Sequence, residues 1–379
     1  MVEWKIVFLD TVNQNEQRLK QRITFLLFCF LLLCESSTNI YAQETDHLHL
    51  NDVRILASHN SYKKKPDPKV LKFLSKVKNK IGPENDPLQL EYGHELLSTQ
   101  LNDFKIRGFE LDVYYDPLGG KFSKRKINSF VCGLRKKSKE VGLKSPGFKI
   151  LHIADIDYET NYVTLESALA ELGTWSQNNT MHCPIFVNIE VKATSPGDLS
   201  KILRNLGFKR ATKFTENTFH LLDSIIESNF SADQLYTPVD MKKKNTSLRA
   251  RINNEGWPLY DDCRGKIFFV LEGDNIDLYK NKGERPLFVY GEKEDDNVIF
   301  LLRNDPINNE NEINALTEQY IVRTRSDAGT LEARKNDYTR FFAALTSNAQ
   351  IISTDYYKAD PTIGKFVIRL GEEFILRAP

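Results

Sequence analysis

The sequence contains few cysteines, and this scarcity limits how the fold can be cross-linked. Only five of the 379 residues are cysteines, and two of them, Cys29 and Cys34, lie in an apolar run near the N-terminus. If that run is removed, Cys132, Cys183 and Cys263 remain, enough for at most one internal disulfide and one free thiol. A framework of several disulfides is therefore excluded, and the sequence does not choose the pair.

The chain also lacks an excess of charge of either sign. Its 52 lysines and arginines nearly balance its 51 aspartates and glutamates, so the formal net charge is only +1. This balance provides no general attraction for nucleic acid. We therefore expect no nucleic-acid partner, and any basic binding surface must be local. The content of 41% hydrophobic and 27% charged residues is that of an ordinary globular protein.

Long hydrophobic runs are absent, apart from one short run near the N-terminus. Basic residues (Arg18, Lys20 and Arg22) precede the apolar run 23–34, and Ala42 offers a small residue at a plausible cleavage point. The run is shorter than the roughly 20 residues of a membrane span, although a signal anchor is an alternative. The first 42 residues are therefore predicted to be a signal peptide.

No repeat, low-complexity tract or linker rich in proline and glycine divides the rest of the chain. One domain, spanning residues 43–379, is the economical interpretation. Acceptor sequons at Asn178, Asn229 and Asn245 give weak support for export as a glycoprotein. The expected location is therefore secreted and extracellular.

Short apolar runs alternate with helical patterns, which is typical of βα units in a mostly parallel sheet. Eight strands are predicted, at Val53–Ala57, Gly108–Tyr114, Lys149–His152, Ile185–Val191, Lys266–Leu271, Val298–Leu302, Tyr320–Thr324 and Gln350–Ser353. Helical patterns lie at Thr164–Gln177, Leu199–Leu206, Thr218–Glu227 and Ala328–Ala344. Since eight parallel strands close a barrel, we predict an α/β fold with a TIM-type (β/α)8 barrel, or an irregular form of one.

Polar side chains lie late in the predicted strands, where a barrel of this type collects its chemistry. These residues are His59, Glu110, Asp112, His152 and Glu190. Glu110 and Asp112 are two residues apart, so on a strand they point the same way and can share one cation. Each residue taken singly has a structural explanation, but together, on separate strands, they favour a functional site.

Asn60, Glu110, Asp112 and Glu190 form a set of oxygen ligands. Such ligands, without a thiolate, indicate calcium or magnesium rather than zinc, and calcium would leave room for substrate oxygens. The two histidines, His59 and His152, are then free for proton transfer or phosphate contact. A zinc site that uses both histidines is the competing interpretation.

Several motifs occur in an order and spacing that is more specific than any one of them. They are Ala57–Tyr62, Gln100–Leu101, Gly108–Val113, His152, Ile189–Lys192, Arg264–Leu271, Val322–Ala328 and Ala349–Tyr357. From about Val53 to Tyr357 the chain resembles the calcium-dependent phosphatidylinositol-specific phospholipase C family of secreted, bacterial-type single-domain enzymes. The resemblance implies a TIM-type barrel that hydrolyses the phosphodiester of phosphatidylinositol to diacylglycerol and a cyclic or open inositol phosphate.

The resemblance also implies roles for individual residues. His59 and His152 resemble the catalytic pair, with His152 the expected acid and His59 a transition-state contact, although the two roles are interchangeable on the sequence. One calcium ion would be held by Asn60, Glu110, Asp112 and Glu190. Lys192 is expected to contact phosphate, while Arg323, Arg325 and Tyr356 either line the inositol pocket or are structural.

The segment from Lys63 to Lys80 departs from the family pattern because it is long and contains eight lysines. Asp67 as N-cap, Pro68 in the first turn and Gly82 as stop predict a helix there. Its apolar stripe consists of Val70, Leu74, Val77 and Ile81. The helix is expected either to lie on the barrel with a solvated lysine face or to dock transiently on an anionic membrane surface.

The sequence leaves two alternative functions open. A secreted glycerophosphodiester phosphodiesterase also combines a barrel, paired histidines and a carboxylate-bound metal, but its first histidine is usually followed by Arg-Gly, whereas Asn60-Ser61 follows here. A catalytically silent barrel that binds lipid or glycan is the second alternative, although the proton-transfer and metal positions are all present. The substrate is left open among phosphatidylinositol, its phosphorylated forms and a glycan-linked anchor.

Overall fold

The computed structural model describes residues 47–81, 86–280 and 283–377. The predicted signal peptide and the predicted helix stop at Gly82 therefore lie outside the described residues. Within the three described ranges, no helix is long and apolar enough to cross a membrane.

One compact unit, made of His49–Pro258 and Asp262–Pro379, contains every element considered below. The second unit combines Met1–Leu48 with Leu259–Asp261, and few of its residues are described. Of the cysteines in the described part of the chain, Cys132 is exposed, whereas Cys183 and Cys263 are buried.

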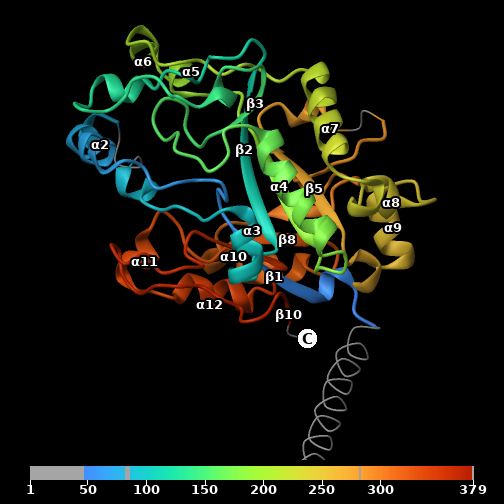
Figure 1. Ribbon diagram of the computed structural model, residues 1–379. Coiled ribbons are helices and arrows are strands. Elements are labelled where there is room, and N and C mark those ends of the chain that lie inside the picture. The colour runs from blue at the N-terminus through green and yellow to red at the C-terminus, as the bar shows by residue number, and fades with distance from the viewer. Residues whose placement is uncertain (1–46, 82–85, 281–282, 378–379) are drawn as a thin grey trace, which may run out of the picture. The chain divides into compact units, whose positions relative to one another are not determined.

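Eight parallel strands curve into a nearly closed barrel, as predicted (Figure 1). The strands are β1 (Val53–Ser58), β2 (Gly108–Asp116), β4 (Ile185–Val191), β5 (Ile267–Gly273), β6 (Phe288–Val289), β7 (Phe300–Leu302), β8 (Ile321–Arg325) and β9 (Ile351–Thr354). Their order is β6-β5-β4-β2-β1-β9-β8-β7. A parallel bridge between Tyr290 and Phe300 joins the two edge strands.

One strand of the prediction is wrong. The segment predicted at Lys149–His152 forms β3 (Gly147–Ile150), which pairs antiparallel with the second half of β2 and lies off the barrel path. Its place is taken by β6, which is only two residues long and too short to show an alternating pattern. A second short strand, β10 (Ile375–Leu376), pairs antiparallel with β1. His152 therefore comes from a strand beside the barrel.

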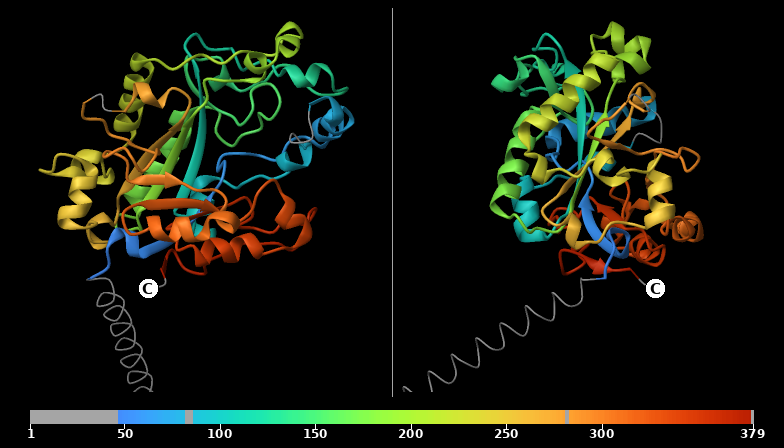
Figure 2. Two further views of the ribbon diagram at one scale, coloured as in Figure 1. Left: turned by 180° about the vertical axis from the view of Figure 1, so that it is seen from behind. Right: turned by 90° about the vertical axis from the view of Figure 1, so that its right-hand side faces the viewer.

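The predicted helices are present with shifted ends (Figure 2). Thr164 caps α4 (Leu165–Asn178) by accepting a hydrogen bond from Ser167 N. The segment predicted as one helix at Ala328–Ala344 is divided in two because Asn336 adopts a left-handed φ of 51°. The other helices are α2 (Pro68–Ile81), α3 (Leu97–Phe104), α5 (Pro196–Leu199), α6 (Lys201–Asn205), α7 (Glu216–Asn229), α8 (Pro238–Lys242), α9 (Leu248–Glu255), α10 (Pro306–Leu316), α11 (Leu331–Lys335) and α12 (Thr339–Thr346).

The two faces of the barrel strands have different partners. Alternate residues of β4, such as Val187 and Ile189, join the apolar core that includes residues of α4 and α7. The other face carries an aromatic layer, in which ring centroids lie 5.0 to 6.1 Å apart, formed by Phe186, Phe268, Phe288 and Phe300. Because strand side chains alternate, Asn188 and Glu190 lie on the same face as Phe186, further toward the C-terminal end. The aromatic layer is therefore the floor beneath the site.

Helix α2 begins where the sequence predicts, with Asp67 accepting a hydrogen bond from Lys69 N at 2.8 Å. Val70 and Leu74 are buried against Ile127 and Tyr158, in a small cluster separate from the main core. The helix thus covers a loop cluster, not the barrel core itself, and Lys69, Lys72 and Lys76 are exposed.

Candidate active site

Three carboxylates from two neighbouring strands form the centre of the site. Glu110 and Asp112 lie on β2, and Glu190 lies on β4 in register with Asp112. Their ligand atoms lie within 4.8 Å of one another. This is the one such group of histidine, cysteine or acidic residues found in the described ranges, and it contains no histidine. The geometry therefore does not support the competing zinc site at His59 and His152.

Two cations neutralise this group. Lys192, which directly follows β4, binds Glu190, and its Nζ lies 3.0 Å from Asp112 Oδ2. Arg323 on β8 binds Glu110. Burial by itself would raise the pKa of Glu110, but Arg323, His59 and Arg325 together attract the carboxylate and hold the pKa at about 2. Burial, with Glu190 and Glu110 nearby, raises the pKa of Asp112 well above its usual value, although Lys192 opposes the shift.

The oxygen atoms of the group fit a hard divalent cation. Both carboxylate oxygens of Asp112 are buried, and apart from the ion pair of Oδ2 with Lys192 they have no hydrogen-bond partner among the described residues. Asn60 has a left-handed φ of 49°, and its Oδ1 lies 3.4 Å from the Tyr62 hydroxyl. Burial, and then Asp112, raises the pKa of Tyr62, as expected for a hydroxyl beside the carboxylates. Carboxylate and amide oxygens are the ligands that calcium prefers, so the residues present suit this ion.

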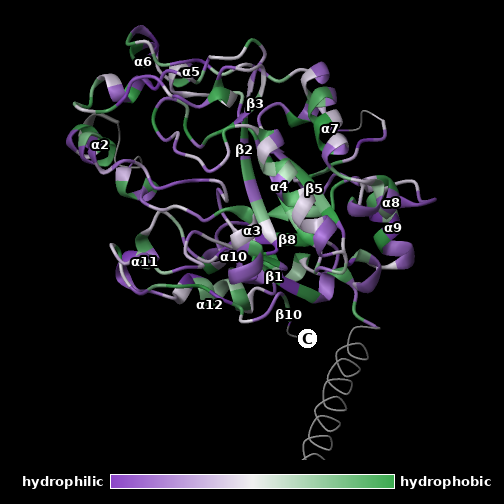
Figure 3. Cartoon of the chain, viewed as in Figure 1, coloured by the Kyte–Doolittle hydropathy of each residue, from purple (hydrophilic) through white to green (hydrophobic). Residues whose placement is uncertain are grey.

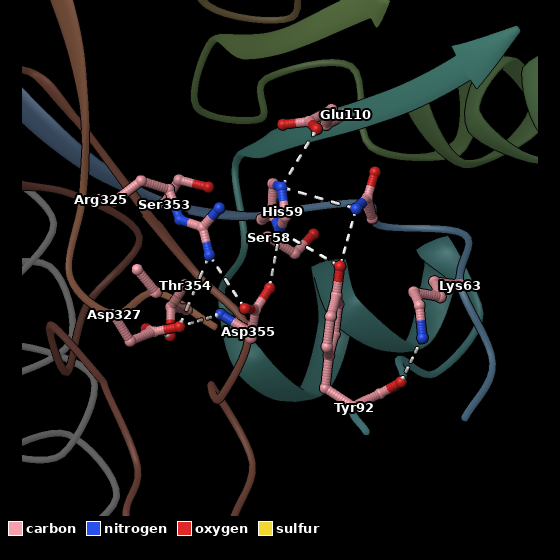
Figure 4. A network of polar contacts seen from close by, with 12 residues as sticks. Ser58, His59, Lys63, Tyr92, Glu110, Arg325, Asp327, Ser353, Thr354 and Asp355 are labelled. Carbon is pink, nitrogen blue, oxygen red and sulfur yellow. Dashed lines mark hydrogen bonds and ion pairs between the residues drawn. The ribbon is translucent and has the colours of Figure 1, made fainter. Parts of the chain in front are cut away.

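The buried carboxylate of Asp355, directly after β9, orients His59 (Figure 4). Its Nδ1 lies 2.8 Å from Asp355 Oδ1, and Arg325 Nη2 donates to Asp355 Oδ2 at 2.9 Å. Because a carboxylate can only accept, Nδ1 carries the proton and Nε2 faces Glu110, whose Oε1 is 3.6 Å away. Burial and then Arg325 lower the pKa of His59, although Glu110 and Asp355 oppose the shift.

His152 is held in a similar way, by an aspartate that a cation contacts in turn. Its Nδ1 lies 2.8 Å from Asp157 Oδ2, and the Nζ of Lys63 lies 3.2 Å from the same carboxylate oxygen. Lys63 is fully buried, so it does not belong to the exposed lysine face expected for the segment Lys63–Lys80, whether that face meets solvent or lipid. Each histidine is therefore held by an aspartate, and each aspartate by a cation, buried Lys63 or partly buried Arg325.

Tyr92 connects the two arrangements (Figure 4). Its hydroxyl accepts a hydrogen bond from Asn60 Nδ2 at 2.7 Å and lies 3.4 Å from His59 Nδ1. Lys63 Nζ lies 4.3 Å from the centroid of the Tyr92 ring and donates to the Tyr92 carbonyl at 3.0 Å. The supports of His59 and His152 thus share one buried network.

The residues expected to contact substrate have different surroundings. Lys192 lies beside the carboxylates, and Arg323 and Arg325 are buried in ion pairs with Glu110 and Asp355. The ring of Tyr356 is buried in the main core, edge-on to Phe366. For all four residues, contact with inositol or phosphate stays a prediction.

Sequence reasoning missed the residues that orient the histidines, namely Asp157, Asp355 and Lys63. Asp355 comes directly after a strand, the same signal that singled out Glu190, but Lys63 was grouped with exposed lysines. Glu272 was also missed. It is in register with Glu190 on the neighbouring strand β5 and accepts a hydrogen bond from Asn188. Burial and then Glu110 raise the pKa of Glu272 to about 7.

The site combines two aspartate-bound histidines and three clustered carboxylates on a parallel barrel, a set of groups that could move protons and hold a divalent cation. The family model described as "Phosphoinositide phospholipase C, Ca2+-dependent" matches residues 48–379. The chain belongs to this family of calcium-dependent phosphodiesterases. No curated protein matches the chain with significant similarity.

Solved structures support the fold. A calcium-dependent phosphoinositol-specific phospholipase C from a Gram-negative Pseudomonas species, in its apo form, has a TM-score of 0.51 at 14% identity, covering 88% of this chain and 96% of that one. The structure described as its myoinositol complex gives the same TM-score and identity, covering 88% and 97%.

Proposed function

We propose that the protein cleaves phosphatidylinositol, with calcium, to diacylglycerol and a cyclic inositol phosphate. The observation that carries the proposal is the pairing of His59 with Asp355 and of His152 with Asp157, beside the Glu110–Asp112–Glu190 group. Such a site can move two protons and neutralise a phosphate. Family membership supports the same chemistry at a coarser level.

The histidines divide the proton transfers in this proposal. The inositol ring has a hydroxyl next to its phosphate-bearing carbon, so attack within the substrate needs no captured water. His59 Nε2, left unprotonated by the Nδ1 contact to Asp355, accepts the hydroxyl proton. His152, which Asp157 holds through Nδ1, donates a proton to the diacylglycerol oxygen as it leaves. This changes the expected role of His59 from transition-state contact to base.

The charged residues beside the histidines stabilise the phosphate. Lys192 lies next to the carboxylates and can bind a phosphate oxygen. Calcium held by Asn60, Glu110, Asp112 and Glu190 would neutralise phosphate charge and lower the pKa of the attacking hydroxyl. Arg325 and Lys63 hold Asp355 and Asp157 in place.

An assay on two substrates tests this function. We expect hydrolysis of phosphatidylinositol vesicles with calcium, no hydrolysis with excess chelator, and a cyclic phosphate signal by phosphorus NMR. Preference for glycerophosphoinositol with a linear product would indicate a glycerophosphodiester phosphodiesterase. Binding of either lipid without any product would indicate a silent barrel.

We also propose that the protein acts outside the cell. The basis is the sequence pattern of residues 1–42, with basic residues, a short apolar run and Ala42. An extracellular site suits a calcium-dependent enzyme, because calcium sites of modest affinity are filled there.

A further inference from the structure

The most exposed hydrophobic side chains of the described residues lie on two segments of the chain, one after β2 and one after β4. They are Leu118 at 87%, Val141 at 73%, Leu199 at 77% and Ile202 at 73%. Elsewhere in the described part, no large hydrophobic side chain exceeds 60%. Leu118 and Val141 lie between β2 and β3, and Leu199 and Ile202 lie on α5 and α6 after β4. We call residues 117–146 and 195–213 the rim surface.

The rim surface is strongly basic although the chain is nearly neutral. Its two segments contain fourteen lysines and arginines but only two acidic residues, Glu140 and Asp198. Their formal charge of +12 contrasts with +1 for the whole protein. Many of these side chains are exposed, including Lys124, Arg135, Lys136, Lys137, Lys139, Lys144, Lys201 and Arg204. Figure 3 shows hydrophobic segments among hydrophilic ones around α5 and α6.

The two segments form one surface. Lys121 Nζ donates to Thr212 Oγ1 at 2.7 Å, and the rings of Phe130 and Phe208 stack with centroids 6.2 Å apart. Lys209 donates to the carbonyl of Lys124. These contacts join the loop after β2 to the chain after β4.

The rim surface lies at the mouth of the site. Both segments follow barrel strands that carry carboxylates, and Asp116, the last residue of β2, is about 13 Å along the strand from Asp112. Asp155, in the turn that holds His152, accepts hydrogen bonds from Lys126 N at 2.9 Å and Lys209 N at 2.7 Å. The turn that bears a catalytic histidine is thus tied to both rim segments.

We propose that the rim surface docks the protein on an anionic lipid bilayer. Leu118, Val141, Leu199 and Ile202 enter the interfacial layer, and the surrounding lysines and arginines contact acidic headgroups. Docking in this orientation places the barrel mouth against the lipid. The biological role of this docking rests on the proposed function. Binding to vesicles is measured without catalysis, so the two proposals can fail separately. A nucleic acid could also bind the positive charge of the rim surface, but it would give no role to the exposed aliphatic side chains.

This surface differs from the one that the sequence suggested. Val70 and Leu74 of helix α2 are buried with Ile127 and Tyr158, while Lys69, Lys72 and Lys76 are exposed, so the described part of the helix offers lipid mainly a lysine face. Changing Lys72 and Lys76 to Gln should therefore weaken membrane binding less than changes on the rim surface. Phe73 stacks on Phe130 of the rim surface, with centroids 6.0 Å apart, so α2 flanks the docking face.

Vesicle sedimentation with matched variants tests the proposal. The probe is phosphatidylcholine vesicles with or without phosphatidylserine, which is not the proposed substrate. Leu199→Ser/Ile202→Ser is compared with Leu331→Ser/Phe342→Ser, whose side chains are 57% and 60% exposed elsewhere. A second pair consists of two triple variants. Arg135, Lys136 and Lys137 of the rim surface are changed to Gln in one, and Lys242, Lys243 and Lys244, outside the rim surface, are changed to Gln in the control.

Each rim variant should lose at least about tenfold in affinity for the acidic vesicles. Both controls should bind like the unchanged protein, and salt should weaken only the charge-dependent part. The rim variants should hydrolyse a water-soluble inositol phosphodiester as fast as the unchanged protein does. If the unchanged protein hydrolyses neither lipid nor this soluble substrate, the proposed function is refuted, but the docking proposal is not. Equal losses in rim and control variants, equal binding to neutral vesicles, or tighter binding to single-stranded RNA would overturn the docking proposal.

Discussion

Lys63 is fully buried and its Nζ lies 3.2 Å from a carboxylate oxygen of Asp157. Burial by itself lowers the pKa of Lys63, and the attraction of Asp157 opposes that effect. The ammonium group of Lys63 also donates hydrogen bonds to the carbonyls of Leu90 and Tyr92, at 2.7 and 3.0 Å. A lysine that looks like one of a solvated series therefore supports the aspartate that orients His152.

Removing Lys63 should destabilise the fold and disturb catalysis together. Lys63→Met leaves the buried carboxylate of Asp157 without its lysine and with only the contact to His152, so the free energy of unfolding should fall by about 3–5 kcal/mol in urea titrations. Lys78→Met is the control, because its pair with Asp86 is partly exposed and worth at most about 1 kcal/mol. Losses of equal size would show that the buried pair has no special role. The double variant Lys63→Met/Asp157→Asn should recover part of the stability, but not the turnover.

Neutralising one carboxylate should weaken calcium binding. Asp112→Asn removes charge from the group whose oxygens lie within 4.8 Å of one another. We expect calcium affinity, measured by calorimetry, to fall by at least about tenfold, and the rise in melting temperature on adding calcium to shrink. Glu318→Gln, at an exposed position, serves as control. A calcium affinity that does not change in Asp112→Asn would remove this group from the metal site.

Loss of either histidine should slow turnover of phosphatidylinositol by at least about a hundredfold, the usual scale of acid and base catalysis. A substrate with a better leaving group needs no proton on the departing oxygen, so it should rescue His152→Ala and not His59→Ala. Single-turnover rates on both substrates measure the difference. Rescue of His59→Ala alone would reverse the two roles, and near-normal rates in both variants would refute the assignment.

Acid should destabilise the protein through His94. Burial lowers the pKa of His94 to about 4, although Asp355 and the carbonyl of His59 oppose the shift. Below the unfolded pKa near 6.5, the unfolded chain takes up a proton that the folded protein does not. Stability should therefore fall as the pH drops from about 6.5 to about 4, by about 3 kcal/mol in total.

His94→Gln keeps a donor toward the His59 carbonyl and removes the titration. Urea titrations of this variant across the same pH range should show a flatter dependence than those of the unchanged protein. Parallel curves for the two proteins would mean that His94 does not control the acid sensitivity.

Expression with the complete N-terminus tests export. The mature protein should begin near Gln43 if the apolar run 23–34 belongs to a cleaved signal peptide. N-terminal sequencing of material from the medium checks the cleavage point. An intact chain found only in the membrane fraction would indicate a signal anchor.

Much of the barrel could be predicted because strand identity is a local property. The bounds of β4, Ile185–Val191, agree with its apolar run, and the two-residue period placed Glu110 and Asp112 on one face before any contact was known. β6 could not be found this way, because two residues carry no period. β3 was assigned to the barrel because the pattern of an apolar strand does not tell which neighbour it pairs with.

The sequence by itself determined the residues with the chemistry of the site, which are two histidines and a set of oxygen ligands at the ends of apolar runs. Only the tertiary structure decided how they are supported. Arg323 meets Glu110 across 213 positions of the chain, and Asp355 meets His59 across 296. Local periodicity sets which face a side chain takes, whereas these pairs exist only because the barrel closes. The pairing of β2 with β4 likewise brings together the two basic segments of a nearly neutral chain.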